Sequence, residues 1–273
     1  MTESTNEPRD DAPTVIAIAV LAFIVADIAH EVIGHGAAYL AVGGRSFIMT
    51  TTRWIGQGVH VDSSGHLFVG LEHGDLYGRI FSFGGPLGSL VFAGLSWLAL
   101  RALRRPAMRL RLFLWLTFAF NLFWGVGYLI YSGVTGGGDW AETVRGALPD
   151  PVWRLLLVVA GVVFYRLSIR ALAGAIPGSP GRLWRLVWIS YWAAGIIACV
   201  AALFDPRGAD QAYKSAALVS FLSAAPLLLI PRLPQRSPLP PEPVTRSLGW
   251  ILAGLLASAS FVGALGPGIP VSL

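Results

Sequence analysis

The sequence predicts an all-α membrane protein with six or seven transmembrane helices and a small β-rich segment at the membrane interface after the first helix. Charged residues make up 13% of the 273-residue chain and hydrophobic residues 55%, whereas a soluble domain usually carries about a quarter charged residues. The mean hydropathy is +0.64. The apolar residues are gathered in stretches of roughly 20, the length with which a helix crosses a bilayer core. An ordinary soluble domain and a disordered chain are therefore excluded.

Seven apolar stretches are candidates for membrane spans. Arg166 and Arg170 interrupt the fourth stretch, and the seventh is rich in Gly and Ala, so the expected number of spans is six or seven. We expect a polar tail (1–13), a membrane core with three spans and the β-rich loop (14–145), and a C-terminal group of membrane helices (146–273). The seven stretches cover residues 14–42, 77–100, 110–133, 152–176, 183–204, 212–231 and 247–268.

Two segments outside these stretches have a distinct composition. The segment 45–75 follows the first stretch; its first half is dense in Thr, Ile, Val and aromatic residues and is interrupted by Gly56 and Gly58. This pattern favours a short β-hairpin over a helix. The segment 231–243 contains six prolines and is predicted to be an extended loop outside the membrane.

Basic residues outnumber acidic ones, with 20 Lys and Arg against 15 Asp and Glu. In a membrane protein such an excess is typical of cytoplasmic loops, so it does not indicate a nucleic-acid partner. With seven spans and a cytoplasmic N-terminus, 13 of the 20 basic residues fall on the cytoplasmic side. This distribution favours that orientation and places 45–75 outside, while the opposite orientation stays open. The use of Arg in place of Lys, with abundant Gly and Ala, points to a multi-pass protein of a bacterial plasma membrane.

Four ionisable residues lie close together in the first apolar stretch: Asp27, His30, Glu31 and His35. A charge buried in a membrane helix costs several kcal/mol unless it is paired or binds a ligand. Three interpretations are open, namely a polar network between helices, a path for protons or ions, and a metal site. The single cysteine, Cys199, allows no thiolate cage within one chain, so a metal would need histidine and carboxylate ligands.

A zinc site accounts for most of these residues, because His-Glu and a second His on one helix bring two imidazoles and a general base to one metal. The usual histidine spacing is four, whereas His30 and His35 are five apart. On a regular α-helix this spacing turns the imidazoles about 140° apart. A single π-bulge near Gly34 would bring them onto one face, and Asp27 could then orient an imidazole from behind. In the alternative, the helix stays regular, and Glu31 and His35 are the ligands on an Asp27–Glu31–His35 stripe. We favour the bulge.

A catalytic zinc site needs a third protein ligand. The candidates are Asp139, which follows three glycines, and Glu72, His73 and Asp75, which precede the second span. The end of the first span, the start of the second and the end of the third lie on one side of the membrane in either orientation. We therefore expect the third ligand to come from one of these positions, with Asp139 preferred because the glycines allow a close approach of the backbone.

The start of the second span is rich in residues that disturb helices. Gly84, Gly85, Pro86 and Gly88 occur within five residues, and the proline removes one backbone hydrogen bond. Either the glycines form a close-packing face against another helix, or this stretch lines the site and offers backbone groups to a substrate.

These features resemble the site-2 protease family of intramembrane zinc metalloproteases. The shared features are an HE..HG motif in an early membrane helix, a β-rich segment after it, a Gly-Pro stretch in the next helix, and a later Asn followed by an Asp next to Gly. The resemblance covers about 14–145. In this chain Ser89 stands where the family often has Asn, and Trp140 follows the Asp in place of Gly. The matching positions are His30, Glu31, His35, Gly36, Gly85, Pro86, Asn121 and Asp139.

The resemblance implies that His30, His35 and Asp139 hold zinc and that Glu31 activates a water molecule for the hydrolysis of peptide bonds in membrane or membrane-adjacent substrates. It also implies a site near the cytosol, opposite to the side that the Arg distribution favours. A non-catalytic protein is the alternative, either a transporter with a polar site at the membrane midplane or a protease-derived binding scaffold. The residues expected behind or around the ligands are Asp27, Gly85, Pro86 and Asn121.

Overall fold

In the part of the chain that the structure describes, six helices are long and apolar enough to cross a membrane. The computed structural model describes residues 9–42, 46–51, 54–56, 59–61, 67–69, 76–103, 106–206, 208, 221–233 and 242–272. Within these ranges the candidate spans are Ala12–Ala41, Gly78–Ala102, Met108–Thr135, Asp150–Leu172, Pro180–Ala202 and Leu248–Leu265. The predicted helical architecture, with several helices long and apolar enough to cross a membrane, is therefore confirmed.

The first span consists of three consecutive helical segments. The helix α1 (Ala12–Asp27) passes directly into the π-helix η1 (Ile28–His35), and α2 (Gly36–Ala41) follows. The side chain of Asp11 caps α1 by accepting a hydrogen bond from the backbone N–H of Thr14.

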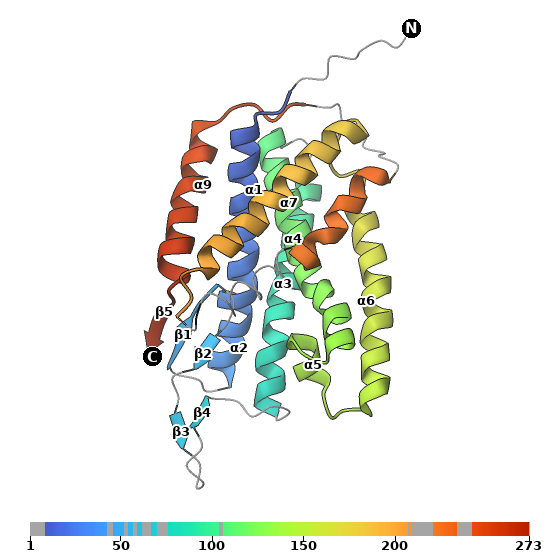
Figure 1. Cartoon of the computed structure of the whole chain (residues 1–273). Coiled ribbons are helices and arrows are strands. Elements are labelled where there is room, and N and C mark those ends of the chain that lie inside the picture. Colours follow the sequence, from blue (N-terminus) through green and yellow to red (C-terminus); the bar gives the residue numbers. More distant parts are fainter. Residues whose placement is uncertain are drawn as a thin grey trace.

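The other spans surround or flank the first one (Figure 1). They are α3 (Leu76–Ala102), α4 (Met108–Thr135), α6 (Asp150–Leu172), α7 (Pro180–Ala202) and α9 (Leu248–Ser260), which the π-helix η4 (Phe261–Leu265) continues. The helix α1 packs against α4, α7 and α9. Phe23 of α1 is in edge-to-face contact with Phe120, Trp124 and Phe261 at centroid distances of 5.9, 5.6 and 6.2 Å. An aromatic core of this kind holds α1, and with it η1, in a fixed position.

Two uncertain spans of the sequence have different outcomes. Arg166 and Arg170 do not interrupt the fourth span, because α6 runs without a break to Leu172. In the stretch 212–231, residues 212–220 lie outside the described residues, and the rest contributes to the short 3₁₀ helix η3 (Ala225–Arg232). Most of the proline-rich segment 231–243 likewise lies outside the described residues.

The β-rich segment is present as short strands at the end of the bundle where α2 ends (Figure 1). Strands β1 (Ser46–Met49) and β2 (Trp54–Gly56) pair antiparallel, with Ile48 opposite Ile55, so the predicted hairpin is confirmed here. Strand β5 (Ile269–Ser272), near the C-terminus, adds to the other edge of β1, a pairing that the sequence did not predict. A separate pair is formed by β3 (Val59–Val61) and β4 (Leu67–Val69).

Candidate metal centre

The two histidines of the first span face the same point. The segment η1 between Ile28 and His35 is π-helical. The i→i+5 hydrogen bonds of a π-helix enclose one residue more than the i→i+4 hydrogen bonds of an α-helix. The imidazoles of His30 and His35 consequently lie edge to face with ring centroids 5.0 Å apart. The predicted bulge is confirmed, and the alternative of a regular helix is wrong for this segment.

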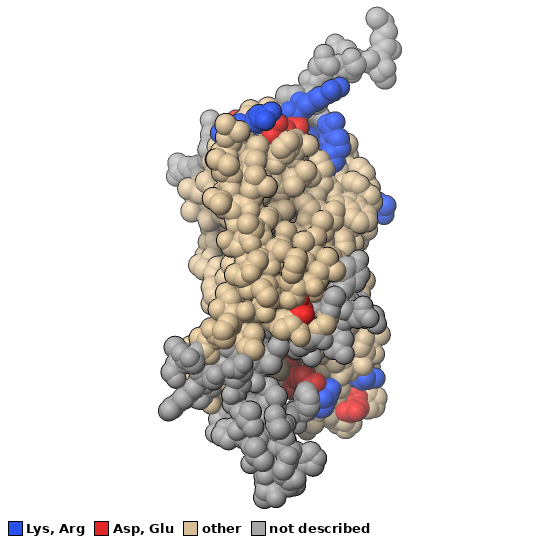
Figure 2. Space-filling model, turned by 60° about the vertical axis from the view of Figure 1, so that its left-hand side comes forward, with Lys and Arg blue, Asp and Glu red and all other residues tan. Residues whose placement is uncertain are grey.

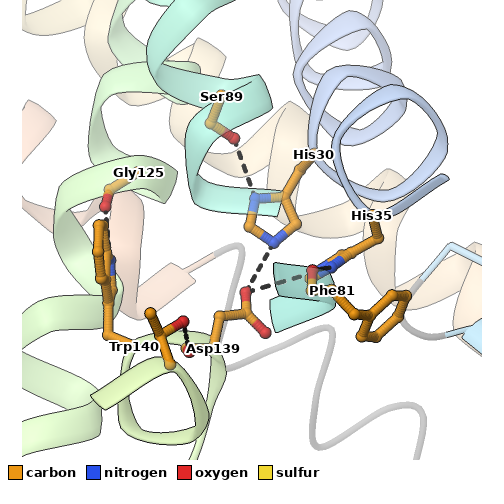
Figure 3. A network of polar contacts seen from close by, with 8 residues as sticks. His30, His35, Phe81, Ser89, Gly125, Asp139 and Trp140 are labelled. Carbon is orange, nitrogen blue, oxygen red and sulfur yellow. Dashed lines mark hydrogen bonds and ion pairs between the residues drawn. The ribbon is translucent and has the colours of Figure 1, made fainter. Parts of the chain in front are cut away.

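Asp139 completes a group of three potential metal ligands (Figure 3). Its Oδ2 atom lies 3.0 Å from His30 Nε2 and 3.6 Å from His35 Nε2. One ligand atom from each of the three side chains lies within 4.8 Å of the others, so the group could hold a metal ion. The predicted proximity of Asp139 to both imidazoles is confirmed. The other candidates for a third ligand, Glu72, His73 and Asp75, lie outside the described residues.

A glycine turn brings Asp139 back to the histidines. After α4, Gly136 and Gly138 adopt φ angles of +74° and +85°, which only glycine reaches without strain. Asp139 is then the first residue of the short helix α5 (Asp139–Val144). The indole N–H of Trp140 donates to the carbonyl of Gly125 in α4 at 2.9 Å. Trp140, which stands where the resemblance has Gly, thus anchors the segment that carries Asp139.

The nitrogen atoms on the far side of both imidazoles have partners on α3 (Figure 3). His35 Nδ1 donates to the backbone carbonyl of Phe81 at 2.9 Å, and His30 Nδ1 is hydrogen-bonded to Ser89 Oγ at 3.0 Å. Asp27, which was expected to orient an imidazole, takes no part in these hydrogen bonds. Its side chain is buried, with Oδ2 lacking a hydrogen-bond partner in the described part of the chain.

The glycines of α3 allow it to pack directly on the histidines. A Cβ atom added to Gly85 would lie 2.7 Å from His30 Nε2 and even closer to His35 Nε2. Gly84 and Gly88 face the backbone of Gly34 and of Ala29 in η1. Gly84 and Gly88 therefore form the expected packing face, and Gly85 lies beside the two Nε2 atoms.

Three further residues of the sequence analysis lie around this centre. Glu31 is buried in η1, where it interacts electrostatically with Asp27 and His35. Pro86 lies within α3, and its carbonyl faces Gly125 of α4. Asn121 is fully buried, and its amide donates to the carbonyl of Thr117 in the same helix at 2.9 Å. It lies about one turn before Trp124, whose ring contacts His30.

The aromatic residues that enclose His30 were not predicted from the sequence. The ring of Tyr128 stacks on it at a centroid distance of 5.7 Å, and the ring of Trp124 meets it edge-on at 5.3 Å. Both come from α4, at positions four apart that share one helix face. That spacing was visible in the sequence, but nothing in it indicated that this face meets the first span.

The electrostatics of the site favour an ionised carboxylate. Burial by itself disfavours the charge on Asp139, but the neighbouring His35 and the hydrogen bond with His30 outweigh it and lower the pKa of this carboxyl below its usual value. Asp139 is therefore negatively charged at neutral pH, as a metal ligand has to be.

Comparison of the chain with protein-family models, curated proteins and solved structures finds no match. The residues of this centre form a buried His-His-carboxylate group near one end of a helical bundle of candidate membrane spans, with a further glutamate in the same π-helix.

Proposed function

We propose that the protein is a membrane-embedded zinc metalloprotease of the site-2 protease type, which hydrolyses peptide bonds of membrane or membrane-adjacent substrates. The observation that supports this proposal is the convergence of His30, His35 and Asp139, with Glu31 in the same π-helix. Two imidazoles and one carboxylate are a ligand set of catalytic zinc sites, which keep a fourth position open. Calcium and magnesium favour sites made of oxygen ligands.

The space around the ligands supports this proposal. Gly85 has no side chain beside the two Nε2 atoms, and an added Cβ atom would collide with both of them. The Nδ1 atoms are bound on the opposite side of each ring. An imidazole whose Nδ1 carries the proton offers its Nε2 lone pair to a metal. Both rings are therefore suited to bind through Nε2.

In peptide hydrolysis the residues have separate tasks. His30, His35 and Asp139 would hold the zinc ion, which would supply Lewis acidity toward the scissile carbonyl and lower the pKa of a water molecule to about 7. Glu31 accepts a proton from the attacking water and hands it to the leaving amine as the C–N bond breaks. The burial of both histidines keeps bulk water from their donor atoms.

The experiment that tests this proposal combines zinc content with proteolysis. Full-length protein, purified in detergent without chelator, is expected to contain about one zinc ion per chain and to cleave a membrane-anchored test peptide. The variant Glu31→Gln should keep the zinc and lose cleavage, because the amide keeps the shape of the side chain but takes up no proton at neutral pH. A parent protein free of zinc overturns the proposal. A parent that binds zinc but shows no cleavage dependent on Glu31 is a binding scaffold.

A further inference from the structure

One stripe of α3 supports the histidine pair at three points. Phe81, Gly85 and Ser89 are four residues apart, so they lie on the same face of α3. The carbonyl of Phe81 accepts a hydrogen bond from His35, and Ser89 Oγ is hydrogen-bonded to His30. Between them, Gly85 lies against the two Nε2 atoms. His35 is therefore held by a backbone carbonyl, whereas His30 is held by a side-chain hydroxyl.

The hydrogen bond of Ser89 selects between two orientations of the His30 ring. Trp124 and Tyr128 pack on this ring, but such contacts barely distinguish it from the same ring turned by 180°, which exchanges nitrogen and carbon positions. Ser89 Oγ, fully buried at the interface of α3 and η1, offers a polar partner for Nδ1 alone. With Nδ1 directed to Ser89, Nε2 is directed to Asp139.

We propose that Ser89 is a positioning residue of the metal centre, which accepts a hydrogen bond from His30 Nδ1–H and thereby presents Nε2 to the metal. This inference rests on the proposed metal site. Ser89 touches neither a substrate nor the metal, so its effect on the centre passes through the His30 ring. Outer partners of this kind orient ligating histidines and typically change metal affinity by about 10- to 100-fold when they are removed.

Binding of Co²⁺ to the zinc-free protein tests this role without any measurement of proteolysis. The visible absorption of Co²⁺ reports the geometry and number of its ligands, and a titration reports its affinity. We expect Ser89→Ala to bind Co²⁺ about 10- to 100-fold more weakly than the parent, with a changed absorption spectrum. The matched control is Ser96→Ala, which alters a buried serine seven residues further along α3 and should leave both affinity and spectrum unchanged.

A second pair of variants separates the hydroxyl group from the volume of the side chain. Ser89→Thr keeps a hydroxyl, whereas Ser89→Val has nearly the same shape without it. The threonine variant should bind Co²⁺ more tightly than the valine variant, by a similar factor of about 10 or more. Equal affinities of these two variants, or a parent-like affinity and spectrum of Ser89→Ala, overturn the role of Ser89. A parent that binds no Co²⁺ instead removes the metal site itself.

An independent observation concerns the two ends of the bundle. In the described part of the chain, nine arginines lie at or next to helix ends on the side where α1 begins, and three lie on the side of α5. Figure 2 shows basic side chains gathered at the former end, above a broad and mostly uncharged surface. The nine are Arg9, Arg101, Arg109, Arg111, Arg170, Arg182, Arg185, Arg232 and Arg246, and the three are Arg79, Arg145 and Arg154.

Hydrogen bonds join the segments of the arginine-rich end into one surface. Arg182 is bound to Asp10 in the N-terminal segment at 2.7 Å, Arg109 donates to the carbonyl of Arg246 at 3.5 Å, and Arg111 donates to the carbonyl of Ala175 at 3.4 Å. Among the described residues, the excess of Arg therefore lies at one end of the bundle. Lys and Arg concentrate in short loops on the cytoplasmic side of membrane proteins.

We infer that the arginine-rich end faces the cytoplasm and that the metal centre lies nearer the opposite face of the membrane, in contrast to the cytosolic side that the resemblance to the site-2 protease family implies. His30 follows Ala12 by 18 residues, which corresponds to roughly 27 Å along a helix, close to the full thickness of about 30 Å of a bilayer core. If the orientation is combined with the proposed protease function, on which this step rests, the substrates are membrane-anchored polypeptides that are cut near the non-cytoplasmic boundary of the bilayer.

Cysteine labelling in intact cells of a bacterial host tests this orientation. The chain has one cysteine, Cys199, which is buried, so the parent is the control for background labelling. Ala147→Cys and Thr245→Cys place a thiol at exposed positions of the metal-centre end and of the arginine-rich end. A membrane-impermeant maleimide should label Ala147→Cys in intact cells and Thr245→Cys only after permeabilisation. The reverse pattern overturns the inference, and neither result depends on metal binding or proteolysis.

Discussion

His30 and His35 are five residues apart, yet their imidazoles lie edge to face with centroids 5.0 Å apart. The π-helical segment Ile28–His35 is the cause, because one additional residue in the turn restores the common face that a spacing of four has in an α-helix. The spacing and the backbone geometry thus compensate for each other, and changing one without the other should destroy the centre.

Deleting one residue inside the π-helix should therefore preserve metal binding. Removal of Ile33, which is exposed, shortens the histidine spacing to four and allows a regular i→i+4 ladder with the flanking helices in phase. We expect this variant to retain zinc. Removal of Leu21 within α1 is the control, because there a deletion rotates the preceding helix by about 100° relative to the site. The zinc content of the two purified variants tests this prediction. A variant lacking Ile33 that contains no zinc would contradict it.

A side chain at Gly85 should exclude the metal. The Cβ atom of Gly85→Ala would lie 2.7 Å from His30 Nε2 and nearer still to His35 Nε2, in the space where a zinc ion forms bonds of about 2.0 to 2.1 Å. We expect the variant to bind no zinc.

The matched control for this variant is Gly94→Ala in the same helix, where a Cβ atom meets nothing within 4 Å. Alanine in place of an interior helical glycine should stabilise α3 by about 0.5–1 kcal/mol, with unchanged zinc content. Metal analysis and thermal unfolding in detergent check both variants. Full zinc occupancy in Gly85→Ala would show that the metal, if any, lies elsewhere.

The sequence was sufficient to predict which residues form the candidate centre. Apolar stretches of roughly 20 residues define the spans, and the order of the spans then brings the ends of the first and third to one side. That parity brings Asp139 to the side of His30 and His35, but Glu72, His73 and Asp75 as well, and the glycines before Asp139 are what favoured it. The π-bulge followed from the histidine spacing of five as one of two possible arrangements. Residue type and chain direction determine these features.

The partners behind the imidazoles could not be predicted in this way. Ser89 and the carbonyl of Phe81 are 59 and 46 residues from the histidines that they bind, and no local pattern indicates which face of α3 meets η1. The addition of β5 to the hairpin is similarly long-range, with Pro270 opposite Ile48. Such contacts depend on how whole helices pack.

Asp139 should be essential for metal binding, whereas its neighbour on α5 should not. Asp139→Ala removes the carboxylate that lies 3.0 Å from His30 Nε2, and a catalytic zinc site does not normally persist with two protein ligands. We expect zinc to be lost. Glu142→Ala on the same helix is the control, because Glu142 pairs with Arg145 at 2.9 Å. Equal zinc content in both variants would argue against Asp139 as a ligand.

Two adjacent aspartates at the other end of the protein should have very different effects on stability. Asp10 accepts hydrogen bonds from the buried guanidinium of Arg182 at 2.7 and 2.8 Å and from the backbone N–H of Val244 at 2.7 Å. Asp10→Ala leaves the charge of Arg182 buried without its carboxylate, which typically costs about 3–5 kcal/mol. Asp11→Ala removes only the cap of α1, on Thr14, and should lower the stability far less.

Thermal unfolding in detergent measures the two changes, and Co²⁺ affinity of the folded variants provides the second readout. Because Asp10 lies at the end of α1 remote from His30, its loss should lower the unfolding temperature without weakening the binding of Co²⁺. An equal, small effect of both substitutions on unfolding would mean that the Asp10–Arg182 pair contributes little to holding the N-terminal segment against α7. A loss of Co²⁺ affinity in folded Asp10→Ala would mean instead that the two ends of the bundle are coupled through α1.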